Sequence, residues 1–157
     1  GIDLVLIGGL GGGNGPYSSY STRVANDFAK LSFINVHNLG ALDHSSTLSY
    51  MAAADLLLFP SVFEPLGLVL LEGIASGCCV LASDAAGPSD LLDEPWGISV
   101  PFGTPENRVQ VLTDGLRKFL SWSREDVDER SKMAKGKSVD FTWRHCASVH
   151  LEALRGG

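Results

Sequence analysis

Residues 55–92 read DLLLFPSVFEPLGLVLLEGIASGCCVLASDAAGPSDLL, and this stretch decides the fold. It opens with a short apolar run over Leu56–Phe59 that predicts a buried strand, ended by a Pro-Ser turn. The apolar segment from about Leu66 to Ser76 is long enough for a helix, and Gly77 follows it in the place of a C-terminal cap. Val80–Ser83 predicts a second buried strand. A strand, a helix and another strand in this order form the repeating unit of a parallel α/β sheet.

The rest of the chain continues this alternation, which predicts an α/β fold with an open, mostly parallel, doubly wound sheet in one domain over residues 1–157. A sheet of this kind winds outward in both directions from a central first strand. Here the chain begins with what resembles the second strand, so we expect the first strand to be absent. Further strands are predicted at Ile2–Ile7, Phe33–Val36 and Ile98–Val100, and further helices at Thr22–Leu31, after Asp43 or Ser45, at Ser89–Leu92, Glu106–Trp122, from the Ser123 cap to about Val139, and at Trp143–Leu154.

Two of these helices have apolar residues at helical spacing, and we expect those residues to face the core. In the helix that follows Asp43 they are Leu48, Met51 and Ala52. In the helix over 106–122 they are Val109, Leu112, Leu116, Phe119 and Leu120.

Two carboxylates flank the start of the helix predicted at residue 66, namely Glu64 and Glu72, eight positions apart. Pro65 is expected in the first turn, where its missing N–H costs nothing, and Gly67 lets a ligand approach the backbone. The N-terminus of a helix offers unpaired N–H groups to a diphosphate, and two separated carboxylates can each hold sugar hydroxyls. The pattern therefore favours a nucleotide-sugar site.

Each of these features also has a plainer interpretation. Glu64 can simply complement the dipole of a well-packed helix, and Glu72 can be a solvated carboxylate. We favour a position for Glu72 in the crevice outside the carboxyl ends of the strands, because a helix between two buried strands has little solvated surface. For the glycine-rich segment over residues 8–13, three interpretations stay open: a dinucleotide fingerprint, a linker-like loop, and a loop that closes over a ligand.

Composition excludes several classes of function. A hydrophobic content of 45% and a charged content of 19% indicate a globular chain with a core, and the formal net charge of −6 argues against a nucleic-acid partner. No segment reaches the roughly 20 apolar residues that span a bilayer, so no membrane span is expected. The three cysteines, Cys78, Cys79 and Cys146, lack the spacing of a metal site, and we expect them to be reduced, as in a cytoplasmic protein.

These residues resemble the C-terminal, donor-binding domain of retaining GT-B glycosyltransferases. This is the large group, glycosyl transferases group 1, that includes glycogen synthases and sucrose-phosphate synthases. The resemblance covers nearly the whole chain and implies a Rossmann-like lobe that forms the C-terminal half of a GT-B fold. It rests on Ala54-Asp55, Pro60-Ser61, the run from Glu64 to Leu68, Glu72, Ser76-Gly77, Gly87-Pro88, Gly97-Ile98 and Phe141-Thr142-Trp143.

The resemblance also implies an activity, which is the transfer of a hexose, by preference glucose, from a nucleotide diphosphate sugar to a hydroxyl acceptor. Glu64 is then the catalytic-site glutamate that contacts hydroxyls of the transferred sugar, and Glu72 binds the ribose. The motif Glu-Pro-Leu-Gly-Leu is most similar to the motif of family members that use ADP-glucose or UDP-glucose. The resemblance implies no metal or other cofactor. Backbone N–H groups near the sugar and diphosphate would come from Leu66, Gly67 and Leu68, and the base would meet the backbone near Leu42.

The chain departs from the family pattern in its positive charges. No Lys or Arg lies between Lys30 and Arg108, and the Arg and Lys with which the family neutralises the diphosphate lie upstream of the residues present. The lobe that holds the acceptor saccharide is missing too. We therefore expect a fragment or a separately encoded half that shows no transfer activity alone; the alternative is a nucleotide-binding or interaction module without transfer activity. A missing central strand would leave unpaired backbone edges, so self-association is also expected.

Overall fold

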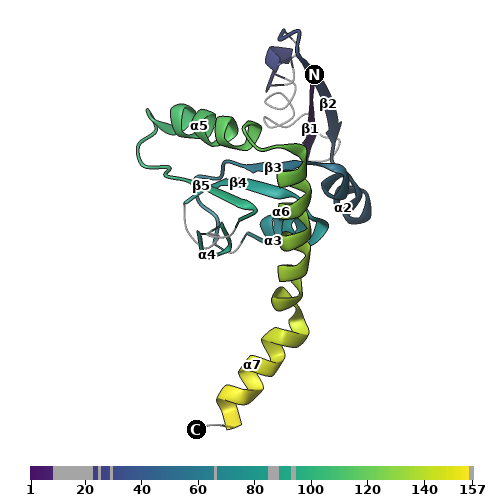
Figure 1. Cartoon of the computed structure of the whole chain (residues 1–157), viewed down its shortest axis with the longest axis vertical. Helices are drawn as coiled ribbons and strands as arrows, with labels where there is room; N and C mark the ends of the chain where they lie inside the picture. Colours follow the sequence, from purple (N-terminus) through teal and green to yellow (C-terminus); the bar gives the residue numbers. More distant parts are fainter. Residues whose placement is uncertain are drawn as a thin grey trace. The chain divides into compact units, whose positions relative to one another are not determined.

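The computed structural model describes residues 1–8, 23–24, 26–28, 30–65, 67–84, 89–92 and 95–155 (Figure 1). They fall into two compact units, residues 1–47 and residues 48–157, and each unit is described by itself. The expectation of one domain over the whole chain stays a prediction. The glycine-rich segment beyond Gly8, Leu66 and the Gly87-Pro88 loop lie outside the described residues.

The first unit is built on two parallel strands, β1 (Ile2–Ile7) and β2 (Ile34–Gly40), with Ile2 opposite Ile34. Strand β1 has the predicted bounds, whereas β2 runs four residues past the predicted end at Val36. The pairing explains the extension, because β2 has a partner on β1 as far as Gly40, opposite Ile7.

Helix α2 (His44–Ala53) follows these strands and begins as predicted after Asp43. The Asp43 carboxylate accepts hydrogen bonds from the Ser46 backbone N–H, at 2.9 Å, and from the Ser46 hydroxyl, at 2.7 Å. These bonds hold the pKa of Asp43 well below its usual range. Met51 is buried as expected, but Leu48 is only half-buried and Ala52 is exposed, so the core face of α2 is narrower than its spacing predicts.

The second unit contains a three-stranded parallel sheet in the order β3-β4-β5. The strands are β3 (Leu56–Phe59), β4 (Cys79–Ser83) and β5 (Gly97–Val100). Open sheets of parallel strands confirm the predicted α/β fold class. The described strands form two sheets, however, where the sequence suggested one.

Helices cover both faces of this sheet, as Figure 1 shows. Besides the part of α2 from Leu48 onward, the described helices of the second unit are α3 (Leu68–Ser76), α4 (Ser89–Leu92), α5 (Arg108–Leu120), α6 (Arg124–Lys137) and α7 (Trp143–Arg155), with a 3-10 turn at Ser138–Phe141. Ser123 caps α6 as predicted, since its hydroxyl accepts from the Asp126 N–H and the Asp126 carboxylate accepts from the Ser123 N–H. Of the described helices, none combines the length and apolar character that crossing a bilayer requires.

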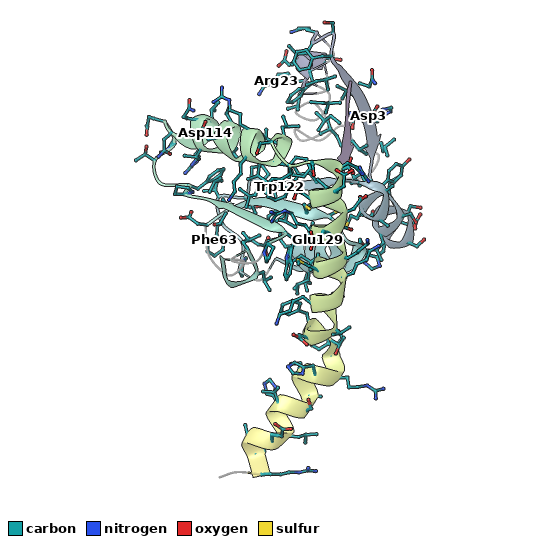
Figure 2. All side chains as sticks on the ribbon, in the orientation of Figure 1. Asp3, Arg23, Phe63, Asp114, Trp122 and Glu129 are labelled. Carbon is teal, nitrogen blue, oxygen red and sulfur yellow. The ribbon has the colours of Figure 1, made fainter. Side chains whose placement is uncertain are left out.

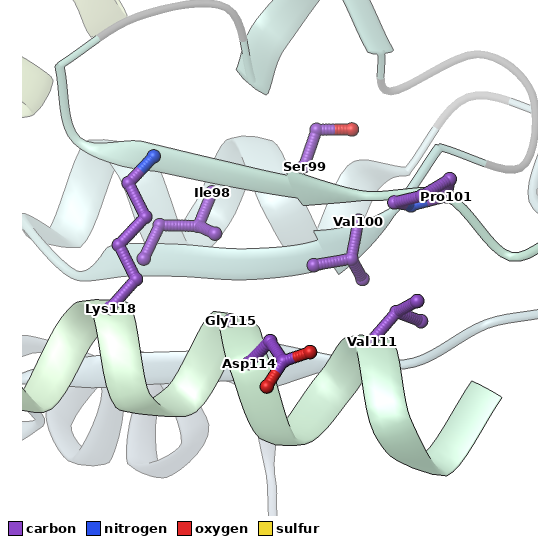
Figure 3. Close-up of a pocket in the computed structure, with 8 residues that line it drawn as sticks. All are labelled: Ile98, Ser99, Val100, Pro101, Val111, Asp114, Gly115 and Lys118. Atoms are coloured by element: carbon purple, nitrogen blue, oxygen red, sulfur yellow. The ribbon is translucent and has the colours of Figure 1, made fainter. Parts of the chain in front are cut away.

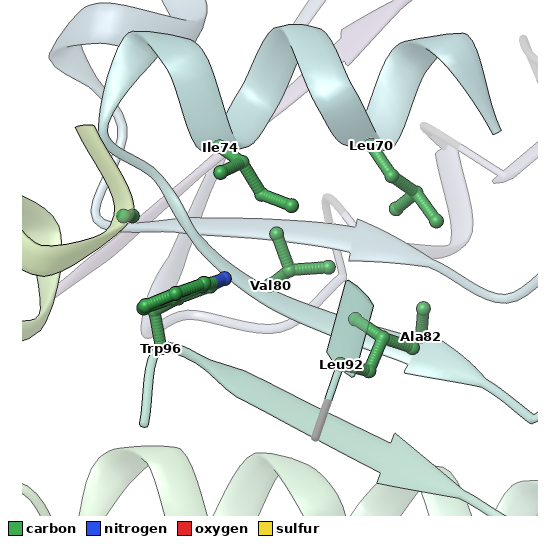
Figure 4. Close-up of a cluster of buried hydrophobic side chains, with 7 residues drawn as sticks. Leu70, Ile74, Val80, Ala82, Leu92 and Trp96 are labelled. Atoms are coloured by element: carbon green, nitrogen blue, oxygen red, sulfur yellow. The ribbon is translucent and has the colours of Figure 1, made fainter. Parts of the chain in front are cut away.

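The core lies on both faces of β4, whose five residues are all buried. On one face Val80 packs with Leu70 and Ile74 of α3 and with Trp96 (Figure 4). On the other face Leu81 packs against β5 and α5. A strand that is buried on both faces reads as a continuous apolar run, which is why the sequence predicted this part of the fold so directly.

Two residues that were expected in the core are exposed instead. Val109 and Leu120, at opposite ends of α5, are 77% and 63% exposed. The side chains of α5 that contact the core are Val111, Leu112, Leu116 and Phe119. Val109 and Leu120 therefore lie outside the packed face of α5, although Phe119, next to Leu120, belongs to it, and apolar spacing alone does not show where a packed face ends.

Candidate donor site

The connection from β3 to α3 carries the first predicted carboxylate. Glu64 is half-buried, and its Oε1 accepts a hydrogen bond from the Gly67 backbone N–H at 2.9 Å. Gly67 is buried and has a left-handed backbone (φ 76°), which favours glycine. The bond ties the carboxylate to the residue that precedes the helix, so Glu64 has the local helix-complementing role that the plainer interpretation required.

Helix α3 begins at Leu68, later than predicted. Pro65 was expected in the first turn, but it lies before the N-cap residue, Gly67. The Gly67 carbonyl accepts from the N–H groups of Leu70 and Leu71, at 2.8 and 3.2 Å. The first N–H groups of an α-helix have no partner within the helix, and in α3 these groups start at Leu68. Gly67 and Leu68 therefore stand where a helix N-terminus can receive an anionic group.

Glu72 lies in the second turn of α3 and is half-buried. Leu70 and Ile74, two positions to either side, are both fully buried in the core. Since successive residues turn by about 100° around a helix, the Glu72 side chain leaves α3 on a different side from these two. The carboxylate is thus kept out of the core without being fully exposed, and its position facing a ligand crevice stays a prediction.

Two residues that the sequence analysis did not single out fix the carboxyl ends of the strands. The Ser83 hydroxyl, at the end of β4, donates a hydrogen bond to the Ser61 carbonyl in the turn after β3. Asp84 accepts the Phe102 N–H at 2.8 Å through its Oδ1 and donates its own N–H to the Val100 carbonyl at 2.9 Å. The Ser83 bond holds the Pro-Ser turn that leads to Glu64, and the two Asp84 bonds connect the end of β4 to the end of β5 and the residues after it. The sequence signal that could have identified Ser83 and Asp84 is a polar Ser-Asp pair at the end of a buried apolar strand.

The segment beside Glu64 exposes apolar side chains. Phe63 is 74% exposed and extends from the connection between β3 and α3 (Figure 2). Val62 and Leu68 are each more than half exposed. In the described part of this connection, exposed apolar side chains therefore lie beside the Glu64 carboxylate.

Leu42, the residue predicted near the base, belongs to the first unit, and it is half-buried just after β2. In the same unit His37 has a partner that the sequence did not reveal: its Nε2 hydrogen-bonds Asp3 Oδ1 at 3.0 Å. That bond lowers the pKa of the Asp3 carboxyl. Both side chains are at least half exposed, so the pair is a surface feature of β1 and β2.

Cys78 and Cys79 are free thiols and are buried at the start of β4, as predicted. The Cys78 thiol donates to the Met51 carbonyl at 2.8 Å, and burial raises its pKa to about 11. A thiol that stays protonated is a poor nucleophile, so these residues serve packing. Among the residues that the structure describes, no group of three or more His, Cys, Asp or Glu side chains could hold a metal ion.

A hollow of about 260 Å³ lies between β5 and α5, away from the predicted site residues in the sequence (Figure 3). Ile98, Val100 and Val111 give it an apolar wall, and Asp114 and Lys118 stand on α5 beside it. Asp114 is already paired with Arg117 at 2.9 Å. None of the predicted donor-site residues lines this hollow, so it does not extend the candidate site.

Residues 2–120 match the family of glycosyl transferases group 1. The chain belongs to this family. Glycogen synthase from Mycobacterium tuberculosis is 31% identical over 124 residues, which make up 75% of this chain and 29% of that protein.

Two solved structures show the same fold. Sucrose-phosphate synthase from Thermosynechococcus elongatus aligns with a TM-score of 0.75 and 23% identity, over 98% of this chain and 38% of that chain. Starch synthase IV from Arabidopsis thaliana, bound to ADP and acarbose, aligns with a TM-score of 0.63 and 19% identity, over 85% of this chain and 28% of that one. The chain thus spans about a third of the length of these relatives.

Four of the predicted site residues lie in one connection and the helix that follows it. Glu64, Gly67 and Glu72 all belong to the segment from the end of β3 to the second turn of α3, and Leu68 is the first residue of that helix. Leu42 lies in the other unit, and Leu66 is outside the described residues. Their roles toward a ligand stay predictions.

The Asp55 side chain in the Ala-Asp part of the motif has a structural role. Arg124 of α6 donates from Nη1 to Asp55 Oδ1 at 2.5 Å, and its Nε lies 3.1 Å from Asp128 Oδ1. Asp55 is next to the amino end of β3, at the opposite end of the strand from Glu64. The pair connects α6 to the sheet, and its exposed position limits its contribution to stability.

Proposed function

We propose that this chain is the donor-binding lobe of a retaining glycosyltransferase that transfers a hexose, by preference glucose, from a nucleotide diphosphate sugar to a hydroxyl acceptor. The observation that carries the proposal is the β3–α3 connection, where the Glu64 carboxylate, the Gly67 backbone and the start of α3 adjoin. Membership of the group 1 family and the ADP bound to the starch synthase support it. The proposal includes a cytoplasmic location and an ADP-glucose or UDP-glucose donor.

The proposed binding mode follows from the chemistry of these groups. The backbone contacts to the sugar and diphosphate are assigned to Leu66, Gly67 and Leu68. Leu68 begins α3, where the helix dipole favours negative charge, whereas the Gly67 N–H donates to Glu64 and would exchange that partner for the donor. Glu72 accepts hydrogen bonds from the ribose hydroxyls, and the backbone near Leu42 meets the base. Charge-assisted hydrogen bonds of this type are roughly twice as strong as neutral ones, so they give the donor a defined orientation.

In the proposed reaction Glu64 contacts hydroxyls of the hexose and positions it. As the bond from the sugar to the diphosphate breaks, negative charge builds on the leaving group, and the N–H groups at the start of α3 stabilise that charge. The hydroxyl acceptor, a saccharide or another hydroxyl compound, approaches from a lobe that residues 1–157 do not provide. Its oxygen forms the new glycosidic bond to the hexose, and its proton passes to the leaving diphosphate. Positioning by Glu64 and stabilisation by the amides are the two contributions of this chain.

A second candidate is a nucleotide-binding or interaction module without transfer activity. It is favoured by the absence of any Lys or Arg from residues 31–107, the stretch that contains every proposed donor-site residue. Without a cation at the diphosphate, stabilisation of the leaving group would rest on amides alone. We therefore expect the chain by itself to bind nucleotide without turning over nucleotide sugar.

Isothermal titration calorimetry with ADP, UDP and GDP tests the donor site. Glu72→Gln keeps the size of the side chain but removes its charge, and it should weaken nucleotide binding by about tenfold or more, because hydrogen bonds to charged groups contribute about 1.5–3 kcal/mol. Glu129→Gln, an exposed position on α6, is the matched control and should leave binding unchanged. Absent binding of all three nucleotides, or equal affinity for the Glu72→Gln and Glu129→Gln variants, would refute the proposal.

Addition of a saccharide acceptor and nucleotide sugar to the same preparation tests the second candidate. Binding without release of free nucleotide is the expected result and agrees with both candidates. Sustained turnover by residues 1–157 alone would show that the missing lobe is not needed and would exclude the module without transfer activity.

A further inference from the structure

Ser83, the last residue of β4, has a buried polar side chain. It is 3% exposed and follows four buried apolar residues, Cys79–Ala82. A hydroxyl that is removed from water costs free energy unless it makes a hydrogen bond, and the Ser83 hydroxyl donates to the Ser61 carbonyl. An alanine at the end of β4 would not need such a partner. The hydroxyl therefore has a specific effect, which is to hold the backbone at Ser61.

This bond attaches a part of the chain that the pairing of β3 with β4 does not reach. The last residues paired between these strands are Phe59 and Ala82. Ser61 lies two positions beyond the end of β3 and is half-buried in the connection to α3. Since Ser83 belongs to a strand that is buried throughout and paired on both sides, it gives this bond a rigid support. The connection is thus held to the sheet beyond the point where β3 ends.

Glu64 lies midway between this bond and the start of α3. It is three positions after Ser61 and three positions before Gly67. Gly67 is held from the other side, because its carbonyl accepts from the Leu70 and Leu71 N–H groups and Leu70 is fully buried in the core. A short span that is fixed at both ends leaves its central residue few positions. Loss of the Ser83 hydroxyl releases one of these ends.

The bond between Glu64 and Gly67 does not by itself keep the carboxylate in place during donor binding. In the structure Glu64 Oε1 accepts the Gly67 N–H at 2.9 Å. In the proposed binding mode both groups exchange this partner: the Gly67 N–H turns to the donor, and the carboxylate turns to hydroxyls of the hexose. The Ser83–Ser61 bond uses neither group, so it remains when the donor is bound. It then holds the backbone that carries Glu64.

We propose that Ser83 is a positioning residue of the donor site. Acting through the Ser61 carbonyl, its hydroxyl keeps Glu64 where the carboxylate meets the hexose; this inference rests on the proposed function. Glu72, proposed to bind the ribose, belongs to α3, which has its own contacts with the core. Ser83 therefore affects the affinity for the sugar part of the donor and not the affinity for the nucleotide.

Isothermal titration calorimetry separates these two affinities. For ADP-glucose and ADP, and for UDP-glucose and UDP, the dissociation constant of the nucleotide sugar is divided by that of the nucleotide. Ser83→Ala should raise this ratio by about tenfold or more and leave the constant for the nucleotide within about twofold, because a hexose contact of a charged carboxylate is lost. Ser83→Thr keeps the hydroxyl and should keep the natural ratio. A ratio that is unchanged in Ser83→Ala, or raised equally in Ser83→Thr, overturns the proposal.

Val100→Ala is the control for a general loss of stability. Val100 is 5% exposed on β5, and its side chain lies beside Gly115 of α5, in the core cluster that does not include α3. Urea unfolding should show lower stability for Val100→Ala and for Ser83→Ala, but only Ser83→Ala should raise the ratio. An equal rise in both variants would reduce the effect to a loss of stability and would overturn the proposal.

A double-mutant cycle tests the route through Glu64. Glu64→Ala should itself raise the ratio, because it removes the carboxylate that meets the hexose. In that background Ser83→Ala should have no further effect on the ratio, since the effects of residues that act through one another do not add. Full additivity of the two changes would assign Ser83 a different route and would overturn the proposal.

Amide hydrogen exchange gives a readout that needs no ligand. The Gly67 N–H donates to Glu64, so its exchange should be faster in Ser83→Ala than in the natural chain and in Ser83→Thr, whereas the Val127 amide of α6 should not change. Equal exchange of the Gly67 amide in Ser83→Ala and in the natural chain, with nucleotide bound normally, overturns the role of Ser83 alone. Binding of none of the four compounds by the natural chain refutes the donor site and this role with it.

Discussion

The contact between α5 and the sheet depends on the absence of a side chain at Gly115. This residue is buried in the middle of α5, and a Cβ atom added to it would lie 2.6 Å from Leu81 Cδ1 and 3.0 Å from Val100 Cγ1. Leu81 is fully buried and Val100 is 5% exposed, so neither side chain can turn away without displacing the core. We predict that Gly115→Ala lowers the free energy of unfolding, although alanine favours helices.

The size of the effect comes from two opposing contributions. Replacing glycine by alanine inside a helix stabilises it by about 1 kcal/mol, whereas extra volume in a packed core costs about 1–3 kcal/mol. Gly136 of α6 is exposed, and a Cβ atom there would meet nothing within 4 Å, so Gly136→Ala has the helix contribution alone. Subtracting one variant from the other isolates the packing cost, and the two should differ by about 1–3 kcal/mol.

Urea unfolding followed by circular dichroism measures both variants against the natural chain. The slope of the free energy with urea should be the same for all three, because the surface exposed on unfolding hardly changes. The midpoint should fall for Gly115→Ala relative to Gly136→Ala. If Gly115→Ala proves at least as stable as Gly136→Ala, then α5 does not approach β4 as closely as described, and the argument for the tight contact is wrong.

Three further predictions concern the core, the thiols and the cap of α2. Ile74→Ala, at a fully buried position of α3, should lower the free energy of unfolding by about 2–5 kcal/mol in the same urea assay, and a loss below this range would mean that the site collapses around the cavity. At pH 8, iodoacetamide should modify the exposed Cys146 in the folded chain and spare Cys78, whose pKa is about 11; mass spectrometry shows which thiol reacts, and equal labelling would contradict the burial. The folded-state pKa of Asp43 is lowered, so its cap stabilises α2 fully above the unfolded pKa of about 3.9, and this stabilisation is lost as the pH falls through the folded value. The difference in the free energy of unfolding between the natural chain and Asp43→Ala should therefore be constant near neutral pH and shrink in acid. A difference that does not change with pH would exclude the carboxylate as its source.

The sequence predicts which residues belong to the candidate site but not the contacts that they make. Glu64, Gly67 and Glu72 could be selected from the sequence because a carboxylate beside a glycine and a helix start is a local pattern. The sequence could not show that Glu64 accepts the Gly67 N–H, nor that the Ser83 hydroxyl holds the Ser61 carbonyl. The second contact joins residues 22 positions apart, and no periodicity relates them.

By itself, the sequence determined the elements whose signals are local. The strands at Leu56–Phe59 and in the buried run that ends at Ser83, the cap of α6 at Ser123 and the end of α3 at Gly77 were all predicted, because apolar runs and capping residues act on their immediate neighbours. Tertiary structure alone decided which helix faces are buried and which of the described strands lies at the centre of its sheet. Val109 has the same apolar character as Val111, yet only Val111 packs on the core, because residues two apart on a helix point in roughly opposite directions and only the fold decides which side meets the sheet. In the same way, β3 and β4 are both apolar runs, and only the order of the described strands shows that β4 lies between β3 and β5.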